Sequence, residues 1–220
     1  MQSRLPTSTR VVIIGGGIVG CSVAYHLAHR GVRDVLLLER RSLTSGTTWH
    51  AAGLVGQLRA TQNLTRLAQY STDLFSTLEA ETGQATGYVE TGSLSVATDS
   101  ERLEELERGA SMARCFGLAV ERVSRERIEE LWPHTRTDDV LGGVFLPGDA
   151  TTSPVDTTRA LALGARQRGV TILENVEVVG VKVRDGRVCG VETTEGTVDA
   201  EVVVNCGGMW GRQIGMMAGV

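Results

Sequence analysis

Proline is scarce in this sequence, although glycine is abundant. Only four prolines accompany 27 glycines among 220 residues, whereas glycine makes up about 7% of an ordinary protein. Collagen and proline-rich disordered linkers both need many prolines, so this composition excludes them. We therefore expect the glycines in tight turns of a globular protein, with the 41% of hydrophobic residues forming its core.

Cysteine is also sparse, and the four cysteines stand apart. Cys21, Cys115, Cys189 and Cys206 form no Cys-X-X-Cys pair and have no histidine or cysteine at metal-ligand spacing. The pattern argues against a zinc site and a disulfide framework, so we expect no metal and a reducing compartment. Lys182 is the only lysine among 22 basic residues, a bias that suggests a GC-rich bacterial genome. We therefore expect a cytoplasmic bacterial protein.

Long runs of one charge are absent as well. The 22 basic and 26 acidic residues give a net charge of -4 and are mixed along the chain, which argues against nucleic-acid and membrane-surface partners. Residues 11–28 carry no formal charge and follow Arg4 and Arg10, so a signal peptide or membrane span has to be considered. Glycines at positions 15, 16, 17 and 20 interrupt this stretch, which makes a targeting or spanning segment the disfavoured alternative.

The uncharged stretch instead predicts a strand, a turn and a helix. Residues 10–14 are a β-branched run, and apolar residues recur at helical spacing from Ile18 to Ala28, before Gly31. Residues 35–38 are a second continuous apolar run, which is typical of a strand buried on both faces of a parallel sheet. Together these segments predict one β-α-β unit.

The middle of the chain mixes helices with short strands. Thr61 begins a long helix with one apolar face, and Gly83 and Gly87 are expected to end it. Residues 88–97 and 143–146 have the composition of strands. We therefore expect an α+β arrangement in this part of the chain.

Two further helix starts carry capping signals. Thr98 and Glu101 have the spacing of a capping box. Ser153, Pro154 and Asp156 supply an N-cap, a proline at N1 and a carboxylate at N3. We expect helices to begin at both points.

The last third of the chain is predicted to be mostly β-structure. Residues 170–173 have the pattern of a buried strand, and residues 177–199 contain the turn dipeptides Asp185-Gly186 and Glu195-Gly196. A small antiparallel meander is therefore expected there. Residues 202–204 predict a last buried strand before an apolar segment that ends at position 220.

The first β-α-β unit contains a nucleotide-binding motif. Gly15, Gly17 and Gly20 form Gly-X-Gly-X-X-Gly between the predicted strand and helix. These glycines permit a tight turn, backbone approach to a pyrophosphate and close packing of helix and sheet, while the helix N-terminus offers N–H groups to phosphate. Glu39, at the end of the second strand, is expected to accept hydrogen bonds from an adenosine ribose and to disfavour a 2′-phosphate. The motif alone leaves both FAD and an NAD-dependent dehydrogenase open.

The segment after this unit resembles one family of flavoenzymes. Residues 45–54, Ser-Gly-Thr-Thr-Trp-His-Ala-Ala-Gly-Leu, and Gln57-Leu58-Arg59 are similar to the sarcosine dehydrogenase and dimethylglycine dehydrogenase family. The similarity continues at residues 81–83, 87–88, 92–94, 147–150 and 203–211.

This resemblance implies an α/β fold. The expected fold is a Rossmann-like FAD-binding domain of the glutathione-reductase-like, D-amino-acid-oxidase type, with an inserted α+β substrate domain. Residues 1–54 and 151–220 would form the FAD-binding domain, and residues 55–150 the first part of the substrate domain. Because no closing strand precedes Val220, we expect a truncated domain that can be inactive on its own, and we name no catalytic acid or base.

In that family the histidine of the Trp-His-Ala-Ala-Gly-Leu run is joined covalently to the 8α carbon of FAD, and the matching residue is His50. A surface or core histidine without a cofactor is the alternative. His26, His29 and His134 have no carboxylate or cysteine partner nearby in sequence, so we expect structural roles for them.

The resemblance also implies further cofactor contacts. Residues 46–48 and Gly53 would supply donors around the flavin, while Trp49 would either wall the flavin or fill the core. Val178 matches a backbone contact to the adenine side, and Gly207 lies where the chain passes close to the cofactor. The full candidate cofactor-binding set is Gly15, Gly17, Gly20, Glu39, Arg40, Gly46, Thr47, Thr48, Trp49, His50, Ala51, Gly53, Leu54, Val178 and Gly207.

The implied activity is oxidation of a secondary or tertiary methylamine, such as sarcosine or dimethylglycine, by hydride transfer to FAD. Electrons would pass to an electron-transfer flavoprotein or to oxygen. Longer family members add a folate-binding part, so tetrahydrofolate is expected only if such a part exists. The same family contains a regulatory subunit of pyruvate dehydrogenase phosphatase, and a catalytically silent interaction module is therefore the alternative, which the intact run around His50 disfavours.

Overall fold

The computed structural model describes residues 4–220, which separate into two compact units. The first unit comprises the chain up to Ala52 together with Leu78–Thr86 and Ser153–Val220. The second comprises Gly53–Thr77 and Gly87–Thr152. The roles predicted for the two domains, binding FAD and binding substrate, stay predictions.

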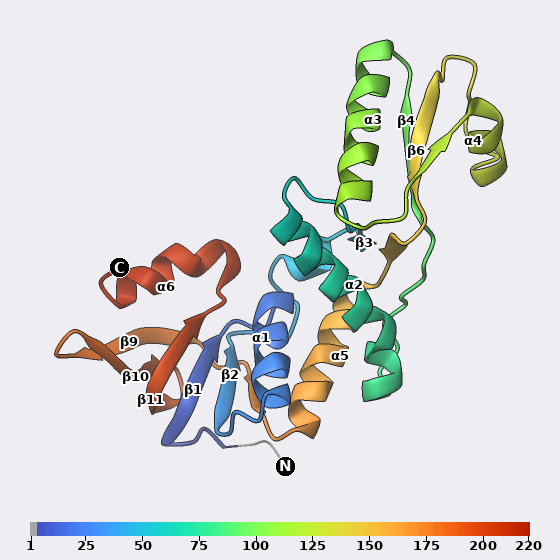
Figure 1. Cartoon of the computed structure of the whole chain (residues 1–220). Helices are drawn as coiled ribbons and strands as arrows, with labels where there is room; N and C mark the ends of the chain where they lie inside the picture. The colour runs from blue at the N-terminus through green and yellow to red at the C-terminus, as the bar shows by residue number, and fades with distance from the viewer. Residues whose placement is uncertain (1–3) are drawn as a thin grey trace. The chain divides into compact units, whose positions relative to one another are not determined.

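The first unit is built on a six-stranded mixed sheet (Figure 1). The strand order is β8 (Thr171–Glu174), β2 (Val35–Glu39), β1 (Ser8–Ile14), β11 (Gly196–Asn205), β10 (Arg187–Thr193) and β9 (Val178–Arg184). The first four strands are parallel, whereas β10 is antiparallel to both of its neighbours. The predicted β-α-β unit is confirmed, with α1 (Ile18–His29) connecting β1 and β2.

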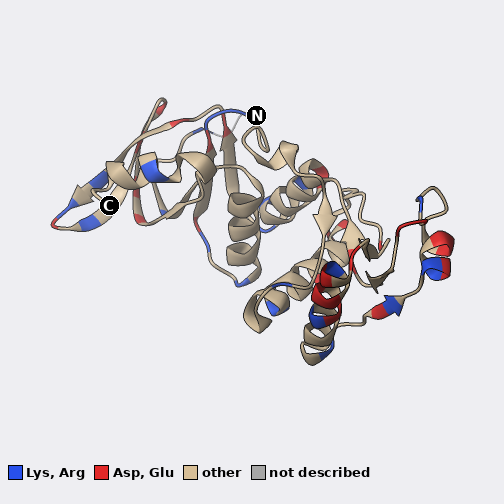
Figure 2. Cartoon of the chain, turned by 90° about the horizontal axis from the view of Figure 1, so that it is seen from above, with Lys and Arg blue, Asp and Glu red and all other residues tan. Residues whose placement is uncertain are grey.

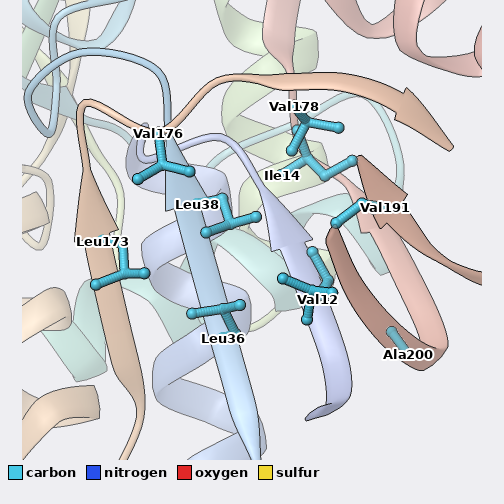
Figure 3. Close-up of a cluster of buried hydrophobic side chains, with 10 residues drawn as sticks. Val12, Ile14, Leu36, Leu38, Leu173, Val176, Val178, Val191 and Ala200 are labelled. Atoms are coloured by element: carbon cyan, nitrogen blue, oxygen red, sulfur yellow. The ribbon is translucent and has the colours of Figure 1, made fainter. Parts of the chain in front are cut away.

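Side chains alternate across the central strands, and one face of the sheet forms a continuous core. Val12 and Ile14 of β1 point to this face, because successive strand residues point to opposite sides. They pack with Leu36 and Leu38 of β2 (Figure 3). The cluster extends toward β8 through Leu173 and Val176, and over the meander through Val178, Val191, Val198 and Ala200. Burial of this apolar surface holds the parallel and antiparallel parts together.

Helices α1 and α5 (Pro154–Gln167) pack against each other. The predicted start of α5 is confirmed, because Ser153 is the N-cap and its hydroxyl accepts a hydrogen bond from the Asp156 N–H at 3.3 Å. Tyr25 of α1 is 2% exposed, and its ring lies against Gly164 of α5.

The predicted meander is confirmed as β9, β10 and β11. Asp185 and Gly186 have φ values of 51° and 72°, as a two-residue hairpin turn requires. The strand predicted at residues 202–204 is present, but as the last part of β11, which runs without a break from the meander to the parallel pairing with β1. Val202 is 47% exposed rather than buried.

The second unit contains a three-stranded antiparallel sheet in the order β4 (Ser93–Ala97), β6 (Gly142–Leu146) and β5 (Glu121–Val123). A two-stranded pairing joins β3 (Leu54–Val55) to β7 (Ala150–Thr151). The helices are α3 (Ser100–Cys115), α4 (Arg125–Leu131) and the N-terminal part of α2 (Gln62–Thr82).

Two local predictions in this region need correction. The strand expected at residues 88–97 begins only at Ser93, because Gly92 has φ +69° and breaks the extended backbone. Thr98 is not the N-cap of α3. Asp99 takes this place, and its carboxylate accepts a hydrogen bond from the Arg102 N–H at 2.8 Å.

Asp149 ties three segments of the second unit together. Its side chain is buried, and its two oxygens accept hydrogen bonds from the Gln57 N–H at 2.8 Å and the Ser93 hydroxyl at 2.5 Å. The Gln57 side-chain amide donates in turn to the carbonyl of Gly148 at 2.5 Å. The segments 57–59, 92–94 and 147–150, on which part of the family resemblance rests, therefore meet at one buried carboxylate.

Charged residues of both signs are interspersed on the ribbon of α3 (Figure 2). Arg102 pairs with Glu105 and Arg108 with Glu104, in both cases between exposed side chains of the same helix. Exposed pairs of this kind contribute little to stability, so they mark a solvated face. Within residues 4–220, no helix combines the length and apolar character that crossing a bilayer requires.

Replacement by alanine should have opposite effects on the free energy of unfolding at two helical glycines, Gly164 and Gly109, because only Gly164 contacts Tyr25. A Cβ on Gly164 would lie 2.9 Å from the Tyr25 ring, which its hydroxyl holds to the Glu81 carboxylate at 2.5 Å. Gly164→Ala should therefore lower the free energy of unfolding by about 1–3 kcal/mol. Gly109→Ala in α3 meets no atom within 4 Å and should raise it by about 0.5–1 kcal/mol. Urea unfolding measures both, and a neutral or stabilising Gly164→Ala would contradict the packing.

Candidate functional site

The turn between β1 and α1 is closed by contacts between backbone atoms. Gly15 has φ +112°, and a Cβ on it would lie 2.5 Å from the carbonyl oxygen of Cys206. A Cβ on Gly20 would lie 1.9 Å from the carbonyl oxygen of Gly15. Both distances are too short for any side chain, so only glycine permits this turn.

The N-terminus of α1 is capped from another loop. Gly17 occupies the N-cap position and has no side chain to cap the helix. Thr48 supplies the missing group, because its hydroxyl accepts a hydrogen bond from the Ile18 N–H at 3.1 Å. Other N–H groups of the first turn have no partner within the helix and, with the helix dipole, favour a bound anion.

Glu39 connects this turn to the end of β2. One carboxylate oxygen accepts a hydrogen bond from the Gly16 N–H at 2.7 Å, and the other accepts one from the Arg41 N–H at 2.9 Å. Each carboxylate oxygen has two acceptor positions, so Glu39 can still accept hydrogen bonds from a ligand hydroxyl. The ribose contact predicted for Glu39 stays a prediction.

A cavity of about 320 Å³ lies at the carboxyl ends of β1, β2 and β11. At this end of the sheet β1 leads into α1 and on to β2 at one edge of β1, whereas β11, at the other edge, leads into α6 (Gly211–Met217), so the strand order switches direction at β1. Open α/β sheets bind ligands at such a switch point. We call this cavity the dinucleotide cleft, because the Gly-X-Gly-X-X-Gly motif lies beside it. Nine members of the candidate set line it: Gly15, Gly17, Glu39, Arg40, Gly46, Thr47, Thr48, Val178 and Gly207.

The remaining predicted residues do not line the dinucleotide cleft. Gly20 packs α1 against the β1 turn, as described above. Trp49, His50 and Ala51 lie at or beside the 3₁₀ helix Thr48–His50 and are exposed. Gly53 and Leu54 belong to the second unit.

Trp49 does not fill the core, because it is 59% exposed. Its ring lies 3.8 Å from the His50 ring, measured between centroids, with an angle of 57° between the two planes. The His50 imidazole is exposed as well. The structure therefore leaves the side chain chosen for the covalent linkage accessible to a reaction partner.

Val178 is 8% exposed, and its side chain belongs to the core cluster of the sheet. Val178 also lines the cleft, so the core of the sheet forms part of the cleft wall at this point. The predicted backbone contact of Val178 with a cofactor stays a prediction.

The turn after β11 is shaped by Asn205, which sequence reasoning missed. Its side-chain oxygen accepts a hydrogen bond from the Gly207 N–H at 3.1 Å, and its amide donates to the Gly211 carbonyl at 2.7 Å. A Cβ on Gly207 would lie 2.3 Å from Cδ1 of Ile214 in α6 (Gly211–Met217). An asparagine directly after a predicted strand and before a glycine pair was the available signal.

The cleft also includes Trp210, Gln213 and Met217, which follow β11 and were not predicted. Trp210 ends the 3₁₀ helix Gly208–Trp210, and its ring lies 3.9 Å from the guanidinium carbon of Arg40.

Two thiols near the cleft have raised pKa values. Burial raises the pKa of the Cys21 thiol to about 12 and also raises the pKa of Cys206. Both side chains are therefore protonated at neutral pH, which disfavours covalent chemistry at these thiols. In the part of the chain that the structure describes, no three His, Cys, Asp or Glu residues are grouped to hold a metal.

Four observations indicate that the cleft suits an adenine dinucleotide. Gly15 and Gly17 bring backbone without side chains to its floor, and a helix N-terminus with capped geometry lies beside them. An acidic residue ends β2, and the cavity volume falls at the lower end of the range for small-molecule sites.

Comparison with known proteins agrees with this geometry. A family model described as FAD dependent oxidoreductase matches residues 10–220. The chain belongs to this family. Among solved structures, L-proline dehydrogenase from P. horikoshii superimposes with a TM-score of 0.92 at 29% identity, over 98% of this chain and 57% of the other. Glycine oxidase from Geobacillus kaustophilus gives 0.86 at 30% identity, over 98% and 59%. The predicted fold class is confirmed.

Curated relatives of this FAD-dependent oxidoreductase chain include the proteins that the sequence resembles. Mitochondrial sarcosine dehydrogenase of Mus musculus is 40% identical over 98% of this chain, and mitochondrial dimethylglycine dehydrogenase of Rattus norvegicus is 43% identical over 95%. The mitochondrial pyruvate dehydrogenase phosphatase regulatory subunit of Mus musculus is 40% identical over 96%. The chain covers 24% of each of these relatives, about a quarter of their length.

The cap that Thr48 provides predicts a loss of stability when its hydroxyl is removed. Thr48→Val keeps the shape of this buried side chain but leaves the Ile18 N–H without its acceptor. The free energy of unfolding should fall by about 1–2 kcal/mol. Thr48→Ser keeps the hydroxyl and should lose less. Guanidinium unfolding followed by circular dichroism compares the variants, and equal stability of Thr48→Val and wild type would contradict the cap.

Proposed function

We propose that this chain binds FAD in the dinucleotide cleft and belongs to an enzyme that oxidises N-methylated glycines. The observation that carries the proposal is the meeting of the Gly15–Gly17 turn, the N-terminus of α1 and the Glu39 carboxylate in one cleft. The relatives named sarcosine and dimethylglycine dehydrogenase support this substrate class. FAD, when bound, accepts a hydride equivalent from the carbon next to the amine nitrogen.

The residues of the cleft have separate tasks in this proposal. The Gly17 backbone and the first turn of α1 bind the pyrophosphate, because no side chain blocks their approach. Glu39 accepts hydrogen bonds from the ribose and repels a 2′-phosphate, which excludes phosphorylated nicotinamide cofactors. Gly46, Thr47 and Thr48, which line the same cleft, supply further hydrogen-bond donors.

His50 is the proposed point of covalent attachment to the 8α carbon of FAD. Its exposed imidazole, which lies next to Trp49, supports this role, because a neutral ring nitrogen must reach the flavin to bond with it. Electrons would leave the reduced flavin for oxygen or an electron-transfer flavoprotein.

A second candidate is a regulatory interaction module without oxidase activity. It is favoured by the 40% identity with the pyruvate dehydrogenase phosphatase regulatory subunit, which equals the identity with sarcosine dehydrogenase. Both candidates allow a bound nucleotide. They differ in whether an amine substrate reduces the flavin.

Flavin binding and reduction test the proposal. Purified chain mixed with FAD should remain yellow after desalting, and anaerobic addition of sarcosine or dimethylglycine should bleach the flavin absorbance. Gly17→Val should lose the colour, because its side chain enters the phosphate position. Gly17 has an ordinary φ of -77°, but its Cβ would lie 3.1 Å from the Thr48 hydroxyl oxygen, so a circular dichroism spectrum checks that the variant stays folded. A colourless wild-type protein would contradict FAD binding. A bound flavin that dithionite reduces but neither amine bleaches would contradict oxidation of N-methylated glycines by this chain.

Covalent attachment has its own test. After acid precipitation and denaturing electrophoresis, the wild-type band should fluoresce, and the His50→Ala band should not, because the linking nitrogen is gone. His134→Ala, in the second unit, is the matched control and should keep the fluorescence. A fluorescent His50→Ala band would show that another residue holds the flavin.

A further inference from the structure

A stacked pair of side chains joins two segments of the dinucleotide cleft that are distant in sequence. Arg40 directly follows β2, and Trp210 ends the 3₁₀ helix after β11. The guanidinium carbon of Arg40 lies 3.9 Å from the centroid of the Trp210 ring, and both residues line the cleft. At this distance the guanidinium is in cation–π contact with the indole.

Stacking on an aromatic face leaves the hydrogen-bonding capacity of an arginine intact. The five N–H groups of a guanidinium lie in its plane, so a ring above that plane uses none of them. Other arginines of the first unit use these N–H groups in ion pairs with carboxylates, as Arg166 does with Glu174 and Arg168 with Glu81. Among residues 4–220, Arg40 has no such ion pair, and its guanidinium contacts the Trp210 ring.

The Trp210 ring is held in place by its own surroundings. Its backbone N–H donates to the Gly207 carbonyl at 3.0 Å. A Cβ on Gly46 would lie 3.7 Å from the ring edge, an ordinary van der Waals distance, so the indole lies beside the loop that carries Gly46. A fixed ring restricts the rotamers of the arginine that stacks on it.

The charged residues that line the cleft indicate that Arg40 binds a negatively charged group of the ligand. Two carboxylates, Glu39 and Glu177, and two guanidinium groups, Arg40 and Arg41, line the cleft. The first turn of α1 carries no acidic residue. A pyrophosphate brings two negative charges, which need cationic donors in fixed positions to offset the repulsion from the carboxylates.

We infer that Trp210 is a positioning residue that orients the Arg40 guanidinium so that its N–H groups bind the phosphate oxygens of the dinucleotide. This inference rests on the proposed function, because it requires a dinucleotide in the cleft. According to this inference, Arg40 and Trp210 recognise the phosphate charge of the ligand rather than its adenine base. Arg40 makes the contact, and Trp210 acts through Arg40.

Two ligands that differ only in phosphate separate this role from simple packing. Isothermal titration of the full chain with ADP and with adenosine measures both affinities. Arg40→Gln and Trp210→Leu should each weaken ADP binding about tenfold or more, because a charged hydrogen bond is lost or misaligned. Adenosine affinity should change less than twofold in both variants. Trp210→Phe keeps an aromatic face and should bind ADP nearly as the wild type does.

The combination of the two changes tests whether the residues act as one unit. Arg40→Gln with Trp210→Leu should bind ADP no more weakly than Arg40→Gln alone, since the tryptophan acts through the arginine. Arg33→Gln removes the same charge at the opposite end of β2, and Trp132→Leu removes a tryptophan of the second unit. Both controls should keep wild-type ADP affinity.

Four results would overturn the inference. Equal losses of ADP and adenosine affinity in Trp210→Leu would mean that the indole only packs the cleft. Additive losses in the double variant would mean that the two residues act separately. If the wild type binds ADP and FAD but all variants bind equally well, the inference fails and the proposed function stands, whereas a wild type that binds neither ligand contradicts both.

Discussion

The structure of the first unit depends on the close approach of three backbone segments at the end of β1. The Gly15 carbonyl excludes any side chain at position 20, and the Cys206 carbonyl excludes one at position 15. The Cys206 N–H donates to the Ile14 carbonyl at 2.9 Å, which fixes the end of β11 beside the end of β1. These contacts bring the first turn of α1 and the turn after β11 to the same cleft, so the fold and the site share one set of interactions.

Hydrogen bonds from side chains to backbone N–H groups then hold the cleft in shape. Glu39 binds the Gly16 N–H, Thr48 caps the Ile18 N–H, and Asn205 binds the Gly207 N–H. Each bond satisfies a backbone donor that would otherwise need water or ligand. The polar groups of the cleft are thus oriented before a dinucleotide enters, which lowers the ordering cost of binding.

Local patterns were sufficient to predict the parts of the fold that depend on neighbouring residues. The β1-α1-β2 unit, the Ser153 cap and the Asp185-Gly186 turn follow from hydrophobic spacing and turn chemistry within a few residues. The continuity of β11 depends instead on its pairing with β1 and β10, whereas the choice of Asp99 over Thr98 as a cap is a one-residue difference in a local hydrogen bond. Some contacts join segments far apart in the chain, so no local sequence pattern predicts them. Examples are the contact of Arg40 with Trp210 and the hydrogen bonds of Asp149 with Gln57 and Ser93.

Amide chemical-shift mapping tests most directly whether the dinucleotide binds at this junction of strands. In ¹⁵N-labelled protein, addition of FAD should shift the backbone signals of Gly15, Gly17, Thr48 and Gly207 and leave the signals around Asp149 unchanged. Shifts confined to the second unit, or no shifts at a saturating FAD concentration, would contradict the account.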